Sequence, residues 1–239
     1  MNRPRPTLLA HPRAALAEFV GTAFLLMGVV GSGIMAERLT DDVGLQLLQN
    51  AVATGAVLIA LILALGPASG AHFNPVVTLA DRILGGIDTP TAAVYVASQI
   101  VGAIVGVICA NVMFDLSAVE WSTKSRSGGH LVFAEAVATL GLLVVIFGVV
   151  RARQASMAAF AVGAYIAAAY YFTSSTSFAN PAVTVARMFS DTFAGIDPGS
   201  APWFIVAQLL AAVAAVGLIR LIYPDIESVA DQAVVPHDL

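Results

Sequence analysis

The sequence predicts an all-α integral membrane protein with six transmembrane helices and two re-entrant half-helices, arranged as an inverted repeat. Three observations predict this fold class: the composition, the number of long apolar stretches, and a pattern of polar residues that occurs twice. Of the 239 residues, 59% are hydrophobic and only 11% are charged. A soluble domain carries about 25% charged residues. Lipid is therefore the solvent expected around most of this chain.

Six apolar stretches are long enough to cross a membrane. They lie at residues 14–36, 44–66, 91–114, 130–150, 156–173 and 202–223. Each has about 18–25 residues, and a helix of that length crosses a hydrocarbon core of about 30 Å. The first stretch is too long for the core of a signal peptide and has no convincing cleavage site, so it is expected to remain as a span.

The spans define one membrane domain over residues 14–223, between an N-terminal flank (1–13) and a polar, acidic tail (224–239). With the N-terminus in the cytoplasm, most Lys and Arg residues lie on the cytoplasmic side, as the positive-inside rule requires. An even number of spans returns the C-terminus to that side. We therefore expect a multi-pass protein of the cell (inner) membrane with both termini cytoplasmic.

Three polar markers occur twice in the same order and divide the domain into two halves, approximately 14–114 and 130–223. The first half has Glu18 in "AEFVGTAFLL", Asn-Pro in "HFNPVVTLADR" and Gln99 in "SQIVGAIVG"; the second has Glu135 in "AEAVATLGLL", Asn-Pro in "FANPAVTVAR" and Gln208 in "AQLLAAVAA". Because each half has three spans, the second copy is inverted relative to the first, with a pseudo-twofold axis in the membrane plane.

Each Asn-Pro pair opens a segment that is apolar for only about 8–10 residues, which is half the thickness of the membrane. Proline suits the first turn of a helix, and asparagine is a favoured N-cap. Asn74-Pro75 and Asn180-Pro181 are therefore expected to begin half-helices that enter from opposite faces and meet near the midplane. The preceding "GPASGAHF" and "TSSTSF" are non-helical, and such backbone is tolerated in a membrane only where protein buries it or it lines a watery path. This arrangement predicts a pore.

The chemistry of such a pore favours small neutral solutes that carry hydroxyl groups. Two facing helix N-termini place about half a positive charge each at the centre, which repels cations. Asn74 and Asn180 can cap their helices and aim an amide N–H into the channel. A passing hydroxyl would accept from these amides while upstream backbone carbonyls accept its proton.

The two motifs, Asn74-Pro75-Val76 and Asn180-Pro181-Ala182, resemble the Asn-Pro-Ala boxes of the aquaporin and aquaglyceroporin (major intrinsic protein) family. Together with the inverted repeat and six spans, the likeness covers residues 13–223. "GSGIMAERLTDDV" and "TSFANPAVTVARMFSDTFAGI" look most similar to the bacterial aquaglyceroporins associated with arsenic resistance. The resemblance implies six tilted helices, two half-helices, and a homotetramer with one pore per subunit.

The resemblance also implies a selectivity filter of four positions. They correspond here to Thr54, Ala168 (or Ala167, if "TSSTSFAN" holds one residue more than the usual loop), Ser177 and Val183. The last position is arginine in nearly all relatives. Without that arginine, we expect a wider and less charged opening that passes water, glycerol-like polyols and metalloid hydroxides such as arsenite, with methylated arsenicals as a further candidate.

Several nearby residues have two interpretations. Arg187, one helical turn beyond Val183, either forms a displaced basic site in the outer vestibule that attracts oxyanions or polar solutes, or only binds loop carbonyls or Asp191. Its counterpart in the first half is Asp81, for which a plain charge pair with Arg82 is expected. Val76 either narrows the midplane or packs against a neighbouring helix, and packing is favoured.

Glu18 and Glu135 are carboxylates at membrane depth, so each is expected to face inward and to have partners. A proton relay is one interpretation. The resemblance implies another, in which both glutamates brace the re-entrant loops by accepting hydrogen bonds from their backbones. His72 is expected to brace the first loop as well.

Other function classes lack support in the sequence. No metal-ligand spacing, phosphate-binding loop or catalytic triad is present, so no enzyme, metal site or cofactor is expected, and the scattered basic residues do not indicate nucleic-acid binding. Besides a passive channel, inverted repeats also build alternating-access transporters. A non-conducting structural membrane protein is the third alternative, but it would need occluding aromatic residues at the filter, where small residues are expected.

Overall fold

The computed structural model describes residues 11–152 and 154–226, and this part of the chain is helical with no strand. The helices are α1 (His11–Leu39), α2 (Val43–Ser69), α3 (Pro75–Leu84), α4 (Thr89–Met113), α5 (Gly129–Arg151), α6 (Ala158–Phe172), α7 (Pro181–Ala186) and α8 (Ala201–Ile222), with 3₁₀ turns η1 (Ala155–Met157) and η2 (Arg187–Phe189). The predicted all-α fold is confirmed. Most of the flank 1–13 and of the tail 224–239 lies outside the described residues.

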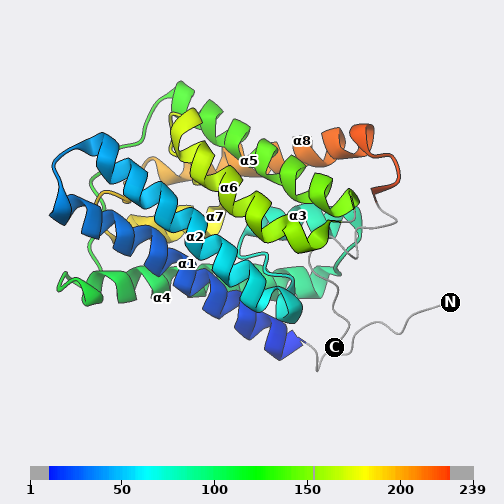
Figure 1. Ribbon diagram of the computed structural model, residues 1–239, viewed down its shortest axis with the longest axis horizontal. Coiled ribbons are helices and arrows are strands. Elements are labelled where there is room, and N and C mark those ends of the chain that lie inside the picture. The colour runs from blue at the N-terminus through cyan, green and yellow to red at the C-terminus, as the bar shows by residue number, and fades with distance from the viewer. Residues whose placement is uncertain (1–10, 153, 227–239) are drawn as a thin grey trace.

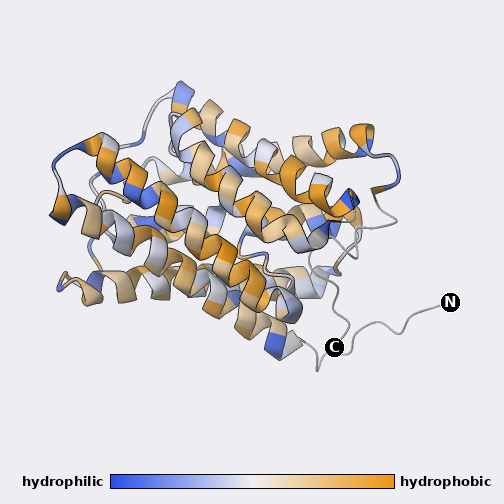
Figure 2. Ribbon diagram, in the orientation of Figure 1, coloured by the Kyte–Doolittle hydropathy of each residue, from blue (hydrophilic) through white to orange (hydrophobic). Residues whose placement is uncertain are grey.

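The long helices form a bundle whose surface is apolar, as a lipid environment requires (Figures 1 and 2). Five of them, α1, α2, α4, α5 and α8, are long and apolar enough to cross a membrane. The remaining predicted span, 156–173, corresponds to α6, which has 15 residues and is preceded directly by η1. In Figure 1, α1 begins and α8 ends at the same end of the bundle.

Glycines set the closest helix crossings. A Cβ on Gly102 of α4 would lie 2.3 Å from the carbonyl oxygen of Phe19 in α1, so the two backbones are in direct contact. At the α2–α6 crossing, a Cβ on Gly55 would lie 2.9 Å from the carbonyl oxygen of Gly163. Helices that associate in lipid use small residues in this way, because close backbones gain van der Waals contact.

The two half-helices begin as the sequence predicts. Asn74 caps α3 and accepts from Val76 N at 3.0 Å, and Asn180 caps α7 and accepts from Ala182 N at 3.0 Å. A proline follows each cap within the first turn. The two helices run from the middle of the bundle toward opposite ends (Figure 1). The helix α7 has only six residues before it tightens into η2, which is shorter than predicted.

Candidate pore

The loops that precede the half-helices have the same unusual backbone. Ala71 and Phe73 stand three and one residues before Asn74, with φ of 52° and 48°. Ser177 and Ala179 occupy the same two places before Asn180, with φ of 48° and 46°. A non-glycine residue in this left-handed region costs about 1–3 kcal/mol and persists only where its surroundings hold it. Both loops must therefore be held by other contacts.

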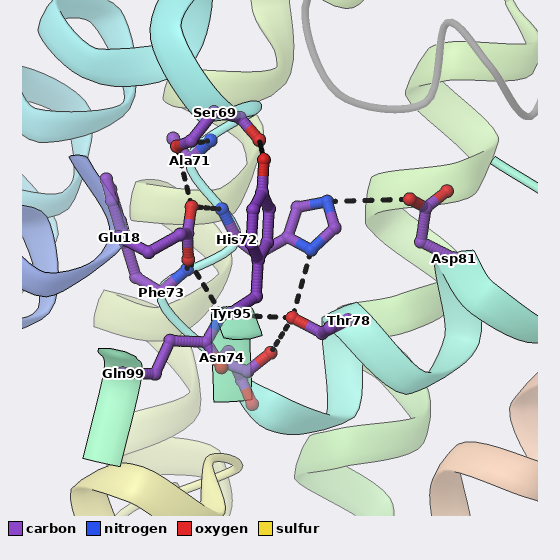
Figure 3. A network of polar contacts seen from close by, with 10 residues as sticks. All are labelled: Glu18, Ser69, Ala71, His72, Phe73, Asn74, Thr78, Asp81, Tyr95 and Gln99. Carbon is purple, nitrogen blue, oxygen red and sulfur yellow. Dashed lines mark hydrogen bonds and ion pairs between the residues drawn. The ribbon is translucent and has the colours of Figure 1, made fainter. Parts of the chain in front are cut away.

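Glu18 of α1 holds the first loop (Figure 3). The carboxylate of Glu18, which is fully buried, accepts from the backbone N–H groups of His72 at 2.9 Å and Phe73 at 2.7 Å. It also accepts from the hydroxyl of Ser69 at 2.6 Å and from the amide of Gln99 at 2.7 Å. Four donors thus satisfy a carboxylate that would otherwise be costly at membrane depth.

Glu135 of α5 repeats this arrangement in the second loop. Its two oxygens accept from Phe178 N and Ala179 N, each at 2.8 Å, and Gln208 donates its amide at 2.7 Å. The backbone donors stand two and one residues before the asparagine in both halves. The geometry suits a carboxylate that fixes a loop rather than one that passes a proton along a chain.

The glutamine of each half links its glutamate to the half-helix. Gln99 donates to the hydroxyl of Thr78 at 2.9 Å, and Gln208 donates to that of Thr184 at 3.0 Å. Each threonine comes four residues after the capping asparagine and donates to its carbonyl. Glutamate, glutamine, loop and half-helix therefore form one buried network in each half, as the three repeated markers of the sequence require.

His72 adds contacts that occur only in the first half (Figure 3). Its Nδ1 lies 3.0 Å from the hydroxyl of Thr78, and its Nε2 lies 3.6 Å from Oδ2 of Asp81. The ring meets Tyr95 edge-on with centroids 5.3 Å apart. Asp81 is buried and faces His72, while Arg82 donates to Thr89. The expected charge pair of Asp81 with Arg82 is therefore wrong, because Asp81 points into the protein.

The two capping asparagines are joined across the middle of the molecule. The amide of Asn74 donates to the carbonyl of Ala179 at 2.8 Å, and that of Asn180 donates to the carbonyl of Phe73 at 2.8 Å. Each amide therefore uses one N–H to tie the two loops together, and it keeps a second N–H. Both asparagines line the same cavity.

That cavity runs from His72 past both asparagines to Arg187. Its walls come from α1, α2, α5 and α6 together with the two loops and half-helices. Thr54, Ser177 and Val183, three of the residues expected at the filter, line it. We call the part of the cavity lined by Thr54, Tyr170, Ser177, Val183 and Arg187 the Arg187 end.

The fourth expected filter residue is not there. Ala168 is exposed on the outer face of α6, Ala167 faces Gly55 of α2, and neither lines the cavity. Tyr170 takes the position instead, with its hydroxyl 3.1 Å from that of Thr54. The expectation of small residues throughout the filter is therefore wrong, because an aromatic ring and its hydroxyl stand where alanine was expected.

Arg187 lies in the cavity wall rather than on the loop surface. Its side chain is 2% exposed, and the guanidinium lies 3.5 Å from the centroid of the Phe178 ring. Its Nε donates to the carbonyl of Ala194. Asp191 bonds to Thr123 instead, with Thr123 N donating at 2.9 Å. Arg187 thus binds a loop carbonyl and also lines the cavity, and its role as a basic site for solutes stays a prediction.

Val76 is fully buried in the core and is absent from the cavity lining. Packing, the favoured interpretation, is what the geometry shows. Among residues 11–152 and 154–226, no group of three or more His, Cys, Asp and Glu side chains could hold a metal ion.

Sequence reasoning missed Tyr170 and Arg126 as residues near the pore. Tyr170 could have been found by its place one turn before the end of the apolar stretch, although only a correct helix register distinguishes it from its neighbours. Arg126 lies in a loop without periodicity, where no pattern indicated that its guanidinium carbon lies 5.0 Å from the Phe178 ring centroid.

Comparisons with known proteins agree with this geometry. The family model "Major intrinsic protein" matches residues 7–174 and 132–238. The aquaglyceroporin AqpS of Rhizobium meliloti (strain 1021) is 48% identical over 208 residues, which are 87% of this chain and 89% of that protein. Human aquaporin-2 is 34% identical over 152 residues, 61% of this chain and 54% of that protein.

Solved structures show the same fold. The X-ray structure of the aquaglyceroporin from Plasmodium falciparum matches with a TM-score of 0.74 at 21% identity, and the match covers 91% of this chain and 99% of that one. The sequence matches, the shared fold and the buried Glu, Asn-Pro and Gln network of each half lead to one conclusion. This chain is a membrane channel that belongs to the major intrinsic protein family, among its aquaglyceroporins.

Proposed function

We propose that this channel passes small uncharged solutes passively: water, glycerol-like polyols, and metalloid hydroxides such as arsenite, with methylated arsenicals as a further candidate. The observation that carries the proposal is the cavity itself, which both capping asparagines line at their junction. Each asparagine amide keeps one N–H for a passing hydroxyl. Trivalent arsenic hydroxide is neutral near pH 7 and resembles a polyol in its hydrogen bonding.

The proposal that the filter is wide enough for solutes larger than water depends on Val183. The residue after the second Asn-Pro-Ala motif carries no charge and no donor here, and Val183 lines the cavity with its apolar side chain. Thr54, Ser177 and the hydroxyl of Tyr170 supply polar contacts on the other sides. A solute with one apolar face and several hydroxyls fits such a lining.

An alternating-access transporter is less well supported. Coupling to an ion gradient needs an ion site near the midplane. The carboxylates at that depth, Glu18 and Glu135, each accept from two backbone N–H groups and from a glutamine amide, so we assign them to bracing the loops. In the first loop, His72 contributes to this bracing by donating its backbone N–H to Glu18.

We further propose that the protein lies in the cell (inner) membrane as a homotetramer, with both termini in the cytoplasm. Large apolar side chains are exposed on several helices, among them Phe133, Trp203, Leu210 and Leu221. Such a surface can face lipid or neighbouring subunits.

The experiment that tests the proposed function is stopped-flow light scattering of proteoliposomes with water, glycerol and arsenite. The wild-type protein is expected to pass all three. Val183→Arg puts a guanidinium into the cavity and is expected to lower glycerol and arsenite flux by about tenfold, which corresponds to about 1.4 kcal/mol on the barrier. Water flux is expected to fall less.

Val183→Ile is the matched control, since it changes the same side chain without adding charge. Its glycerol flux is expected to remain near that of the wild type. If the wild type passes only water, or if Val183→Arg passes glycerol as fast as Val183→Ile, the proposed function is wrong.

A further inference from the structure

Two buried polar atoms at the Arg187 end have no hydrogen-bond partner among the described residues. They are Oγ of Ser177 and Nη1 of Arg187. Both side chains line the cavity, and they are only 3% and 2% exposed. An unpartnered buried donor costs about 1–3 kcal/mol, and more when it is charged. Two such atoms in one cavity wall indicate a place where a ligand supplies the missing partner.

The guanidinium of Arg187 is held firmly in its orientation. Nε is fixed by the carbonyl of Ala194, and the planar group stacks on Phe178 at 3.5 Å. Phe178 is itself fixed, because its backbone N–H donates to Glu135 at 2.8 Å. A preorganised donor loses little entropy when a ligand binds, so this N–H group is suited to recognition.

Two further cations surround Arg187. Arg126 approaches the same Phe178 ring, with its guanidinium carbon 5.0 Å from the ring centroid, and donates to the carbonyl of Gly195 at 2.8 Å. Lys124 donates to the carbonyl of Phe193 at 2.7 Å. Their hydrogen-bond partners are therefore neutral groups: backbone carbonyls and, for Arg126, also the hydroxyl of Thr176.

No carboxylate neutralises these three cations within ion-pair distance. Among the described residues, ion pairs at 4.0 Å or less involve neither Lys124, Arg126 nor Arg187. The acidic side chains of the same region have other tasks: Glu37 accepts from Phe193 N at 2.9 Å, and Asp191 accepts from Thr123 N at 2.9 Å. The three cations therefore have no carboxylate at ion-pair distance, while Glu37, Asp191 and Glu135 act on their charges from farther away.

We propose that the Arg187 end binds small inorganic oxyanions such as sulfate, through Nη1 of Arg187 and Oγ of Ser177, and that a bound anion obstructs neutral solutes. A charged N–H donor and a hydroxyl match two oxygens of a tetrahedral oxyanion, and such charge-assisted bonds are about twice as strong as neutral ones. Anion binding does not depend on which solutes the channel passes. The obstruction rests on the proposed function.

The anion is expected to stop at this site rather than pass through. Beyond the Arg187 end, the walls are largely apolar, with Leu25, Val29, Leu142 and Ile146 among the lining residues. An anion that leaves the three cations for this stretch loses both its hydration and its partners, which is costly.

The test is isothermal titration of sodium sulfate into the purified full-length protein in detergent, with sodium chloride as the ionic-strength control. The wild type is expected to show saturable binding. Arg187→Gln is expected to weaken it at least about tenfold, as the loss of a charge-assisted hydrogen bond predicts. Equal sulfate binding by wild type and Arg187→Gln would overturn the proposal, as would an absence of saturable binding to the wild type.

Arg38→Gln is the matched control variant. Arg38 also bonds a backbone carbonyl and lies over an aromatic ring, that of Phe114 at 5.1 Å, but it does not line the cavity. Its replacement is expected to leave sulfate affinity unchanged. An equal loss in Arg38→Gln and Arg187→Gln would show that only general surface charge is at work, and would overturn the site.

A second variant keeps the test valid if Arg187→Gln does not fold. Ser177→Ala removes one unpartnered atom from a residue whose hydroxyl has no structural bond, so its fold is expected to persist. It is expected to weaken sulfate several-fold, which corresponds to the loss of one hydrogen bond of about 1 kcal/mol. Unchanged affinity in Ser177→Ala would contradict the assignment of Ser177 Oγ.

Glycerol efflux from proteoliposomes with and without sulfate tests the obstruction. Inhibition that follows the binding curve, and whose midpoint moves several-fold to higher sulfate in Ser177→Ala, supports it. Sulfate binding without any glycerol flux means that the proposed solutes are wrong while the anion site holds. Glycerol flux that saturating sulfate leaves unchanged overturns the obstruction.

Discussion

The carboxylate of Glu135 is a single side chain on which the stability of the second loop depends. Its two oxygens receive two successive backbone N–H groups and one amide. Glu135→Gln leaves one oxygen for these three donors and places an amide N–H against one of them. We expect the free energy of unfolding to fall by about 2–4 kcal/mol, because buried donors lose their partner. Thermal unfolding in detergent, followed by circular dichroism, measures the change.

Glu120→Gln is the control for this substitution, since Glu120 is exposed. Its effect on the free energy of unfolding is expected to be within about 0.5 kcal/mol. If both variants unfold at the same temperature, the glutamate does not brace the loop.

The pKa of Lys124 leads to a prediction of how sulfate binding at the Arg187 end depends on pH. Burial, followed by the nearby charges of Arg126 and Arg187, lowers the pKa of Lys124 to about 8, while Glu37 and Asp191 act in the opposite direction. Lys124 therefore loses its charge as pH rises through about 8. Sulfate affinity is expected to fall across this range, because sulfate keeps its own charge there.

Titrations well below and well above this pKa measure the effect. Lys124→Gln is expected to bind sulfate more weakly at low pH and to show little further change with pH. A wild-type affinity that stays constant across the range, or an equal pH dependence in Lys124→Gln, would contradict this prediction.

The filter residues show the limit of the sequence at the residue scale. Motif residues that cap or brace could be placed, because Asn-Pro and the repeated Glu and Gln each indicate a definite local task. Ala168 was misplaced because it was counted back from Asn180 through a non-helical loop. Successive helical residues are rotated by about 100°, so the step of two residues from Ala168 to Tyr170 turns the side chain by about 200°, from the outside to the cavity.

At the scale of elements, the spans were predictable to within three residues at each end. Apolar stretches set their lengths, and N-cap residues such as Asp42 and Asp88 mark two of the starts. The short α7 was less predictable. Its apolar pattern continues past Ala186, but the chain tightens into η2 there, and Arg187 is turned toward Phe178.

The α1–α4 crossing gives a prediction for an element. Gly102→Ala places a methyl group 2.3 Å from the carbonyl oxygen of Phe19, which forces the two helices apart. We expect a loss of about 1–3 kcal/mol in the free energy of unfolding, as for other overpacked interiors. The melting temperature and the yield of monodisperse protein in size-exclusion chromatography measure it.

Gly217→Ala in α8 is the matched control, since a Cβ there meets nothing within 4 Å. Alanine also favours the helix over glycine by about 1 kcal/mol, so this variant is expected to be as stable as the wild type or slightly more so. A Gly102→Ala variant as stable as Gly217→Ala would show that the crossing can open without cost.

At the scale of the whole molecule, a channel and a transporter differ in their kinetics. We expect glycerol flux to rise linearly with its gradient and to be independent of proton and sodium gradients, because Glu18 and Glu135 are both engaged by the loop backbones. Flux measured at increasing glycerol concentrations, with and without each ion gradient, checks this. Saturation together with ion dependence would favour the transporter.

The inverted repeat made the whole fold predictable, because three polar markers in the same order in both halves restrict the possible folds more than any one marker does. The preferred solute, the tetramer and the orientation in the membrane stay predictions. Solute choice depends on side-chain directions such as that of Arg187, which a stretch of sequence letters does not record. Assembly depends on surfaces whose apolar residues suit lipid and protein contacts alike.

The two halves share a backbone plan but differ in charge. Asp81 and Arg187 both stand seven residues beyond their asparagine and are both buried, so equivalent places at opposite ends hold a carboxylate and a guanidinium. For neutral solutes, detailed balance requires equal permeability in both directions, whatever the asymmetry of the pore. Block by a charged ion is not subject to this equality, since the ion has only to bind at one end of the pore. Permeability to neutral solutes should therefore be equal in both directions, whereas block by a charged ion should depend on the side from which the ion is added.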